Sequence, residues 1–254
     1  LAAAKPLSVL SLQGNYLGDD AVALLVQCLT NTPLLKLTSL DLASNNTATG
    51  SQTRSFGKAA AALGALLTGN SSLSSLSVAS NGIRGLAASA VAKGLRNNQS
   101  IQTLKLGWNS FGSAKAMTHL RNSLFTANIT ALDVSYNNIT SKTAHILAEA
   151  LALSTSLRSL VVDGNLLTRA GAQDVHDALT RPDADAVQVS MNDCGVNGRL
   201  SRDFDPSEPG GLYTLDLASE YDMKILFNLV KITLEGCGDF QKGSMTLDGT
   251  GVTK

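Results

Sequence analysis

The sequence is poor in aromatic side chains and in net charge, and each shortage excludes a class of protein. Only 4% of the 254 residues are aromatic, so a core must be built from Leu, Val, Ile and Ala. Lys plus Arg and Asp plus Glu both number 20, without the clustered basic excess that nucleic-acid binding requires. No run of 18 apolar residues occurs, so the sequence predicts no membrane span.

The three cysteines, Cys28, Cys194 and Cys237, are too few and too far apart for a disulfide framework. They predict buried thiols in a reducing compartment. We therefore expect a cytoplasmic protein, with a ciliary or cytoskeletal location as a variant, while an extracellular location stays open. Five N-x-S/T sequons carry little weight, because chance explains this number in a chain rich in Asn, Ser and Thr. The sequons lie at Asn45, Asn70, Asn98, Asn128 and Asn138.

A leucine motif recurs along the chain. "LTSLDLASNN", "LSSLSVASNG", "IQTLKLGWNS" and "ITALDVSYNN" share the spacing L-x-x-L-x-L-x-x-N. Successive copies begin 30, 36, 28, 28, 28 and 27 residues apart, a period that is typical of solenoid proteins. Their first residues are Leu7, Leu37, Leu73, Ile101, Ile129, Leu157 and Ala184.

Each repeat has a strand half and a helix half. In "LRSLVVDGNLL", Leu160 and Val162 alternate with period two, which predicts a short strand with one buried side. The following "RAGAQDVHDALT" has the spacing of an amphipathic helix. Neither half can bury its apolar side alone, so stacked repeats should form a parallel sheet covered by helices.

An asparagine stands at position nine of every motif, where the chain leaves the strand. Its amide can donate and accept, which predicts hydrogen bonds to backbone groups of neighbouring turns that would otherwise be buried without partners. The seven residues are Asn15, Asn45, Asn81, Asn109, Asn137, Asn165 and Asn192.

These frames, with helices such as "GAQDVHDAL", resemble the leucine-rich repeat family, in particular its ribonuclease-inhibitor-like subfamily with repeats of about 28 residues. The resemblance covers Leu7 to Cys194. It implies an α/β fold, a leucine-rich-repeat solenoid or right-handed α/β horseshoe with a parallel sheet on the concave face, helices on the convex face and a C-terminal cap. We expect about seven repeats in residues 1–195 and a capping segment in residues 196–254.

Two repeats depart from the pattern. The second is longer by residues within 44–58, a polar segment that should form a loop between strand and helix, either as a partner-specific protrusion or as a tolerated insertion. The seventh, "ADAVQVSMNDC", has Ala184 at its first apolar site, Gln188 between the framework positions, Asn192 at position nine and Cys194 at the last site. A degraded final turn is expected where stacking ends.

The remaining segment predicts a strand at 212–217, a helix at about 220–230 and a hairpin in "GSMTLDGTGV", which together would cap the open end of the solenoid. The sequence has neither an initiator Met nor a signal peptide, and its first strand starts at Leu7 with no helix or charged cap before it. We therefore expect a fragment of a longer protein.

Side chains between the framework leucines should point onto the concave face. Trp108 and Tyr136 hold equivalent places in adjacent turns, so their rings should be neighbours. Exposed aromatic pairs are typical of binding hot spots, although the two rings could instead cover their own repeats. Lys105 and Asp133 predict a cross-strand ion pair. The expected partner-binding residues are Trp108, Tyr136, Lys105, Asp133, Asp41 and Asp163.

No nucleophile, phosphate or metal motif is present in the sequence. His119, His145 and His176 fall in helical halves, where solvated or locally bonded side chains are the better interpretation, since a metal needs convergent ligands. We expect no cofactor, no metal and no enzymatic activity.

The sequence thus predicts a non-catalytic protein–protein interaction scaffold that binds a protein partner through its concave face and loops. One alternative is a structural subunit of a large ciliary, cytoskeletal or fibrous assembly. Another is a GTPase-activating regulator, since Ran GTPase-activating proteins use a related repeat arc, but the functional residues of that family find no position-by-position match here.

Overall fold

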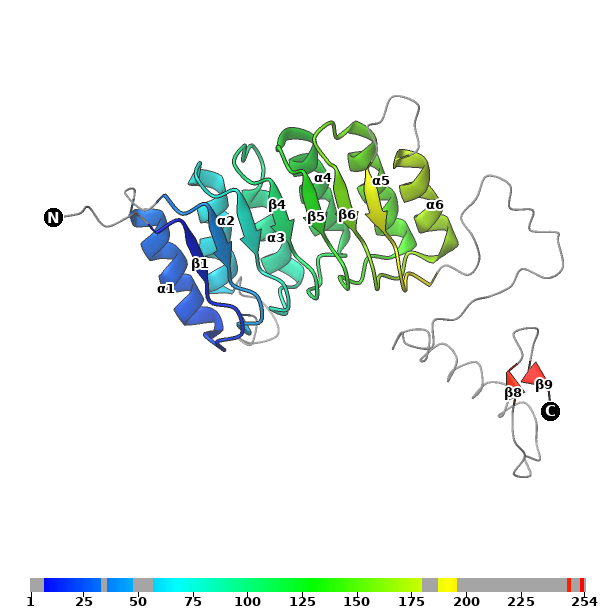
Figure 1. Ribbon diagram of the computed structural model, residues 1–254, viewed down its shortest axis with the longest axis horizontal. Helices are drawn as coiled ribbons and strands as arrows, with labels where there is room; N and C mark the ends of the chain where they lie inside the picture. The colour runs from blue at the N-terminus through cyan, green and yellow to red at the C-terminus, as the bar shows by residue number, and fades with distance from the viewer. Residues whose placement is uncertain are drawn as a thin grey trace.

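Strands and helices alternate along a row of stacked turns (Figure 1). The computed structural model describes residues 7–32, 36–47, 57–179 and 187–195, and the backbone of two short strands near the C-terminus. The strands of the row are β1 (Val9–Ser11), β2 (Ser39–Asp41), β3 (Ser75–Ser77), β4 (Thr103–Lys105), β5 (Ala131–Asp133), β6 (Ser159–Val161) and β7 (Gln188–Ser190). The helices are α1 (Gly18–Asn31), α2 (Lys58–Gly69), α3 (Gly85–Gly94), α4 (Ala114–Thr126), α5 (Ser141–Leu153) and α6 (Thr168–Leu179).

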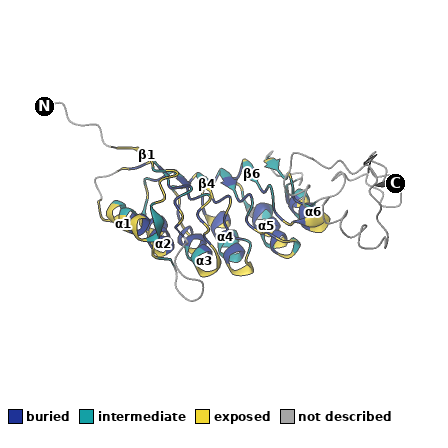
Figure 2. Ribbon diagram, turned by 90° about the horizontal axis from the view of Figure 1, so that it is seen from below, coloured by how far each residue is buried: buried dark blue, intermediate teal, exposed yellow. Residues whose placement is uncertain are grey.

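β1 to β7 form one parallel sheet in sequence order. Leu40 pairs with Leu76, Leu76 with Leu104, and Leu104 with Leu132, so the prediction that these four leucines stack in single file is confirmed. Each helix supplies the crossover that parallel strands need. Figure 2 shows the result as two layers, with the strands along the inner side of the row and the helices along the outer side.

The core lies between the sheet and the helices. Leu104 and Leu106 are fully buried, and burying one leucine contributes about 1.5–3 kcal/mol to stability. Small residues let the helices approach one another, because a Cβ on Gly64 of α2 would lie 2.9 Å from the Ala90 carbonyl oxygen of α3. The first turn is more open, and Val9 of β1 is exposed.

The helix that follows the long second strand-to-helix connection receives its cap from the preceding turn. Gly57 offers no capping side chain, and the Asp19 carboxylate of α1 accepts from the backbone N–H groups of Lys58 and Ala59 at 2.8 and 2.9 Å. Asp20 accepts from Lys58 Nζ at 2.7 Å and thereby raises the pKa of that lysine. Residues 48–56 of the predicted loop lie outside the described residues, so neither interpretation of the insertion is tested.

The register predicted for turn seven was wrong by two residues. Val189 pairs with Leu160 and Ser190 with Val161, so Ser190 rather than Gln188 holds the place between the framework positions. Position nine is therefore Cys194, which is buried, whereas Asn192 is exposed. The Cys194 Sγ donates to the Val162 carbonyl oxygen at 3.2 Å, in the manner of the asparagine amides of earlier turns.

Near the C-terminus, β8 (Thr246–Leu247) and β9 (Val252–Thr253) pair antiparallel, as predicted for "GSMTLDGTGV". The strand expected at 212–217 and the helix expected at about 220–230 lie outside the described residues. The division into a solenoid and a capping segment stays a prediction.

Candidate functional site

A ladder of buried asparagines runs behind the ends of the strands. The Asn137 Nδ2 donates to the carbonyl oxygens of Leu106 and Ser135 at 3.0 and 2.9 Å, and its Oδ1 accepts from the Phe111 N–H at 3.0 Å. Asn45, Asn81, Asn109 and Asn165 make bonds of the same kind. The prediction that the position-nine amides bond to the backbone of neighbouring turns is confirmed for these five. The Asn15 amide donates within its own turn, and the Asn192 amide donates to the Ser190 hydroxyl. The ladder fixes the chain direction at each strand exit.

The residue before each ladder position points outward, and these residues form what we call the exit row. Their backbone φ angles lie between +50° and +72°, and the amide N–H of each of the first six donates to a carbonyl of the next turn at 2.7–2.9 Å. Left-handed backbone suits glycine and small polar residues, and it is unusual for bulky ones. The exit row consists of Gly14, Ser44, Ser80, Trp108, Tyr136, Gly164 and Asp193.

Trp108 and Tyr136 are the two aromatic members of the exit row. Their rings are stacked, with centroids 4.0 Å apart and planes inclined by 15°, so the prediction that they are neighbours is confirmed. Trp108 is nevertheless 57% exposed and Tyr136 is half-buried. Two adjacent turns thus hold aromatic rings in a strained backbone conformation and leave much of the indole open to a partner.

The Tyr136 ring lies against Gly164 and Asp193 of the next two turns, and we call these two residues the seat. A Cβ on Gly164 would overlap the tyrosine ring, so glycine at this position leaves the space in which the ring lies. The tyrosine hydroxyl donates to Asp193 Oδ2 at 3.3 Å. Burial, and then the Asp193 carboxylate, raise the pKa of the Tyr136 hydroxyl. Sequence reasoning missed Gly164 and Asp193, although a glycine beside an aromatic residue in the same row was an available signal.

The predicted carboxylates are partly committed to internal bonds. Asp133 Oδ1 accepts from the N–H and the hydroxyl of Ser135 at 2.9 and 2.6 Å. Asp163 accepts from the Ser190 hydroxyl at 2.7 Å, and Asp41 accepts from a backbone N–H of its own strand exit at 2.9 Å. Within the described residues no ion pair joins Asp133 to Lys105, so that prediction was wrong; the serine bonds hold the aspartate.

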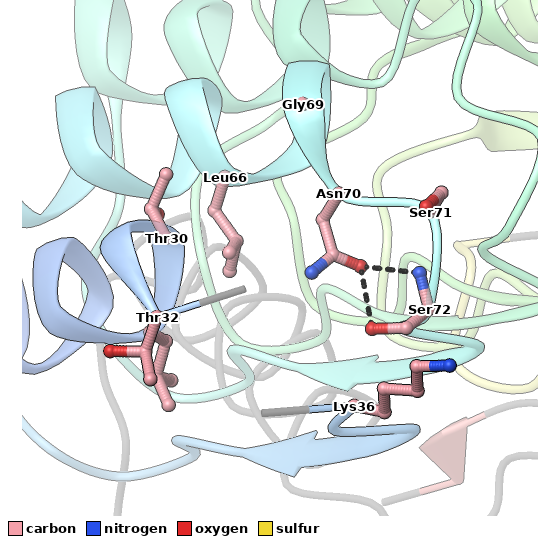
Figure 3. A pocket seen from close by; sticks show the side chains of 9 residues that line it. Thr30, Thr32, Lys36, Leu66, Gly69, Asn70, Ser71 and Ser72 are labelled. Carbon is pink, nitrogen blue, oxygen red and sulfur yellow. Dashed lines mark hydrogen bonds between the residues drawn. The ribbon is translucent and has the colours of Figure 1, made fainter. Parts of the chain in front are cut away.

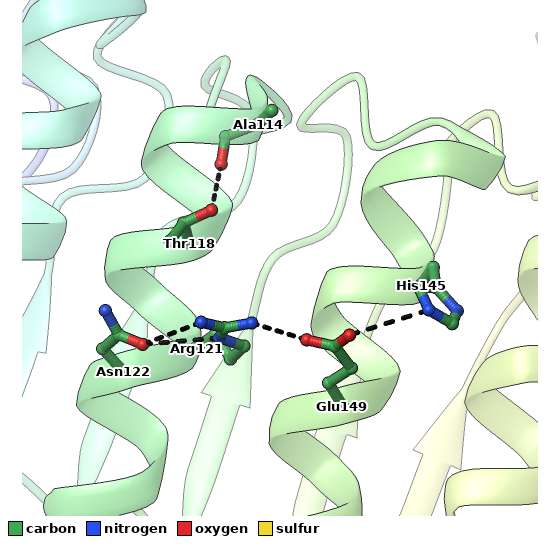
Figure 4. Close-up of polar contacts among 6 residues, drawn as sticks. All are labelled: Ala114, Thr118, Arg121, Asn122, His145 and Glu149. Atoms are coloured by element: carbon green, nitrogen blue, oxygen red, sulfur yellow. Dashed lines mark hydrogen bonds and ion pairs between the residues drawn. The ribbon is translucent and has the colours of Figure 1, made fainter.

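The helix side carries a chain of ion pairs. The Arg121 Nη1 of α4 lies 2.6 Å from Glu149 Oε2 of α5, and Glu149 Oε1 lies 3.7 Å from His145 Nε2 (Figure 4). His145 Nδ1 lies 3.3 Å from Asp174 Oδ2 of α6. These side chains are well exposed, so the Arg121–Glu149 ion pair contributes only about 0.2–1 kcal/mol, and the His145 contacts are ion pairs only when the imidazole is protonated. In His119, burial and nearby cations lower the pKa.

Two of the hollows on the described part of the chain have volumes of several hundred Å³. One, of about 480 Å³, lies at the ends of α1 and α2 (Figure 3). Its Thr30 and Thr32 hydroxyls donate to carbonyls of their own helix, and Asn70 Oδ1 accepts from the Ser72 N–H. The other, of about 730 Å³, lies beside Phe125, which is 63% exposed. These threonine and asparagine groups of the first hollow thus serve local turns.

All five sequon asparagines make side-chain hydrogen bonds. Asn128 Nδ2 donates to the Gln99 carbonyl oxygen at 3.3 Å and Asn138 Nδ2 to the Ser110 hydroxyl at 3.2 Å. Asn45 belongs to the ladder, and the Asn98 Nδ2 donates to the Leu67 carbonyl oxygen at 2.6 Å. Asn70 closes the turn between α2 and β3. A physical cause therefore accompanies these sequons, beyond the chance occurrence expected from composition.

The prediction of buried thiols is confirmed for Cys194 and was wrong for Cys28. Cys194 is buried, which raises the pKa of its thiol to about 11, whereas Cys28 is exposed on α1. Cys237 lies outside the described residues. In the described part of the chain, no three His, Cys, Asp or Glu side chains gather as a metal site would require. None of the helices described there has the length and hydropathy needed to cross a membrane.

A protein-family model described as Leucine Rich repeat matches residues 127–142, which include β5, Tyr136 and Asn137. No match to a curated protein was found. The family match and the single sheet of seven parallel strands alternating with six helices support a leucine-rich repeat protein. The predicted solenoid fold is confirmed. Such repeats generally mediate protein–protein interaction.

Proposed function

We propose that this chain is a non-catalytic protein-binding scaffold that docks a protein partner on its strand side, with Trp108 and Tyr136 as anchors. The observation that carries the proposal is the exposed, stacked aromatic pair, held in left-handed backbone conformations by bonds to the neighbouring turns. A rigid aromatic platform loses little conformational entropy on binding, and tryptophan and tyrosine are enriched among hot-spot residues.

The polar residues named from the sequence would surround this anchor. Lys105 is exposed on β4, and Asp133 and Asp163 are half-buried in the next two turns. Charges at such positions contribute more to partner choice and association rate than to affinity. Asp41 lies two strands from β4, so it would contact only a partner that extends along the sheet.

The ribonuclease-inhibitor-like subfamily is part of the proposal, supported by a full helix after each of the first six strands and by spacings near 28 residues. A cytoplasmic location is also part of it, supported by the free thiols of Cys28 and Cys194.

The test is affinity capture with the immobilised full chain, followed by mass spectrometry. The double variant Trp108→Ala, Tyr136→Ala should lose the proteins that the unaltered chain retains, with affinity reduced at least about 30-fold for a hot spot worth about 2 kcal/mol. Phe125→Ala is the matched control, because it removes an equally exposed ring from the helix side. Retention of the same proteins by the double variant would refute the proposal.

The exposed Phe125 beside the larger hollow favours one second candidate, a structural subunit of an assembly that contacts its neighbours through the helix side. In that case Phe125→Ala should release the captured proteins and the double aromatic variant should retain them.

A further inference from the structure

The environment of the aromatic pair indicates the chemistry of its ligand. Tyr136 covers one face of the Trp108 indole, so the 57% of the tryptophan that is exposed belongs to its other face and edges. In the preceding turn the exit row holds Ser80, which is small. The face of an aromatic ring carries negative potential, and tryptophan is the strongest of the three rings in attracting a cation.

Acidic residues outnumber basic ones in the part of the motif that carries this ring. At motif positions five, seven and eight of turns four to seven, the charged residues are three aspartates and one lysine: Asp133, Asp163, Asp193 and Lys105. Asp193 accepts from the Tyr136 hydroxyl, which increases the electron density of the phenol that stacks on the indole. The local field therefore favours a positively charged ligand.

One carboxylate near the residue that precedes Trp108 has spare accepting capacity. Both bonds that Asp133 accepts go to its Oδ1, and no hydrogen bond to Oδ2 occurs among the described residues. A Cβ on Gly107, the residue before Trp108, would lie 3.3 Å from Asp133 Oδ2. An acceptor oxygen is thus fixed beside the backbone that carries the exposed ring.

We infer that Trp108 and Asp133 together take a cationic side chain, with arginine preferred, so that the partner of the proposed scaffold docks through a basic segment. This inference rests on the proposed function and adds the partner's chemistry. A guanidinium group stacks on an aromatic face while its N–H groups donate to a carboxylate, and it is less strongly hydrated than an ammonium group. Gly164 and Asp193 are positioning residues, because they hold Tyr136 against the indole.

The test uses the fluorescence of Trp108, the only tryptophan in the chain. The full chain is titrated with blocked octapeptides in which glycine alternates with arginine, lysine, glutamine or leucine. The arginine peptide should give a saturable change that weakens with added salt. Binding of the lysine peptide should be about fivefold weaker, and that of the glutamine and leucine peptides at least about tenfold weaker.

The variants separate the ligand contact from the seat. Asp133→Asn should weaken the arginine peptide about fivefold, and the glutamine peptide not at all. Gly164→Ala should displace Tyr136 and weaken the arginine peptide. Gly14→Ala is the matched control: it occupies the same row with φ +72°, against +63° at Gly164, but an added Cβ meets nothing within 4 Å. Far-UV circular dichroism checks that both glycine variants fold, and Asp193→Asn perturbs the seat without backbone strain.

Equal or tighter binding of the glutamine or leucine peptide would overturn the inference, as would the absence of a saturable response to arginine. If Gly14→Ala and Gly164→Ala weaken binding of the arginine peptide equally, the positioning role of Gly164 and Asp193 is refuted. If protein capture depends on Trp108 while the arginine peptide does not bind, the scaffold function stands and the basic partner is refuted. If capture survives the double aromatic variant, the scaffold site itself is wrong.

Discussion

Two neighbouring positions in each turn differ in burial and in how much their residue type varies. The ladder position holds asparagine in every turn but the last and bonds inward to the backbone of adjacent turns, whereas the exit row beside it ranges from Gly14 to Trp108 and faces outward. The same strand stacking fixes both positions. The comparison teaches that residues adjacent in the sequence can have separate tasks in this solenoid. One residue stabilises the fold, and the residue before it is available for recognition.

Backbone strain sharpens the contrast. A left-handed conformation disfavours an L-residue by about 1–2 kcal/mol, most for bulky side chains, so glycine and small polar residues are the economical choice in the exit row. Trp108 and Tyr136 carry this strain at adjacent turns, with φ +56° and +50°. Glycine would avoid this strain, as at Gly14 and Gly164, and the proposed partner is our explanation for aromatic residues here.

The largest effect is expected in the ladder. Asn137→Ala leaves the buried Phe111 N–H without its acceptor, at a cost of about 1–3 kcal/mol. It also removes the bonds to the Leu106 and Ser135 carbonyl oxygens, each worth about 0.5–1.5 kcal/mol, although those oxygens still accept from Asn109 and Trp108. We expect the free energy of unfolding to fall by about 3 kcal/mol in urea titrations followed by far-UV circular dichroism. Asn192→Ala, which alters the exposed asparagine that only resembles a ladder residue, should cost less than about 0.5 kcal/mol. Similar losses of unfolding free energy in the two variants would show that ladder and surface asparagines contribute equally to stability.

A smaller, pH-dependent effect is expected where the ladder ends in a thiol. Burial raises the pKa of Cys194 to about 11 from 9.0. The unfolded chain therefore ionises first, so the contribution of Cys194 is complete below about pH 9 and is lost as the pH rises toward 11. Wild type and Cys194→Ala should converge in unfolding free energy by about 2 kcal/mol over this range. A difference that stays constant with pH would show that the thiol ionises freely in the folded chain.

Most of the fold could be predicted from the sequence because each strand shares one spacing of apolar residues and one asparagine. Leu40, Leu76, Leu104 and Leu132 stack as that spacing requires. Turn seven was misaligned because Asn192 and Cys194 both satisfy a ladder position, and only the pairing of Val189 with Leu160 decides between them.

Less of the candidate site could be predicted. Equivalent places in adjacent turns were enough to bring Trp108 and Tyr136 together. The seat was missed because Tyr136 reaches across two turns to Asp193, and the corrected register is needed to put that aspartate in the same row. The expected ion pair of Asp133 was wrong because a serine two residues later binds the carboxylate locally.

The most direct measurement of the central claim is the unfolding free energy of Trp108→Ala, followed by far-UV circular dichroism because the fluorophore is removed. If the ring serves recognition, the change removes only about 0.5–1.5 kcal/mol of stacking from a largely exposed side chain, because alanine keeps the Cβ that strains a left-handed backbone. The free energy of unfolding should then fall by no more than about 1.5 kcal/mol. A loss of about 3 kcal/mol or more, comparable to that expected for Asn137→Ala, would mean that Trp108 covers its own repeat as part of the fold and would contradict the account.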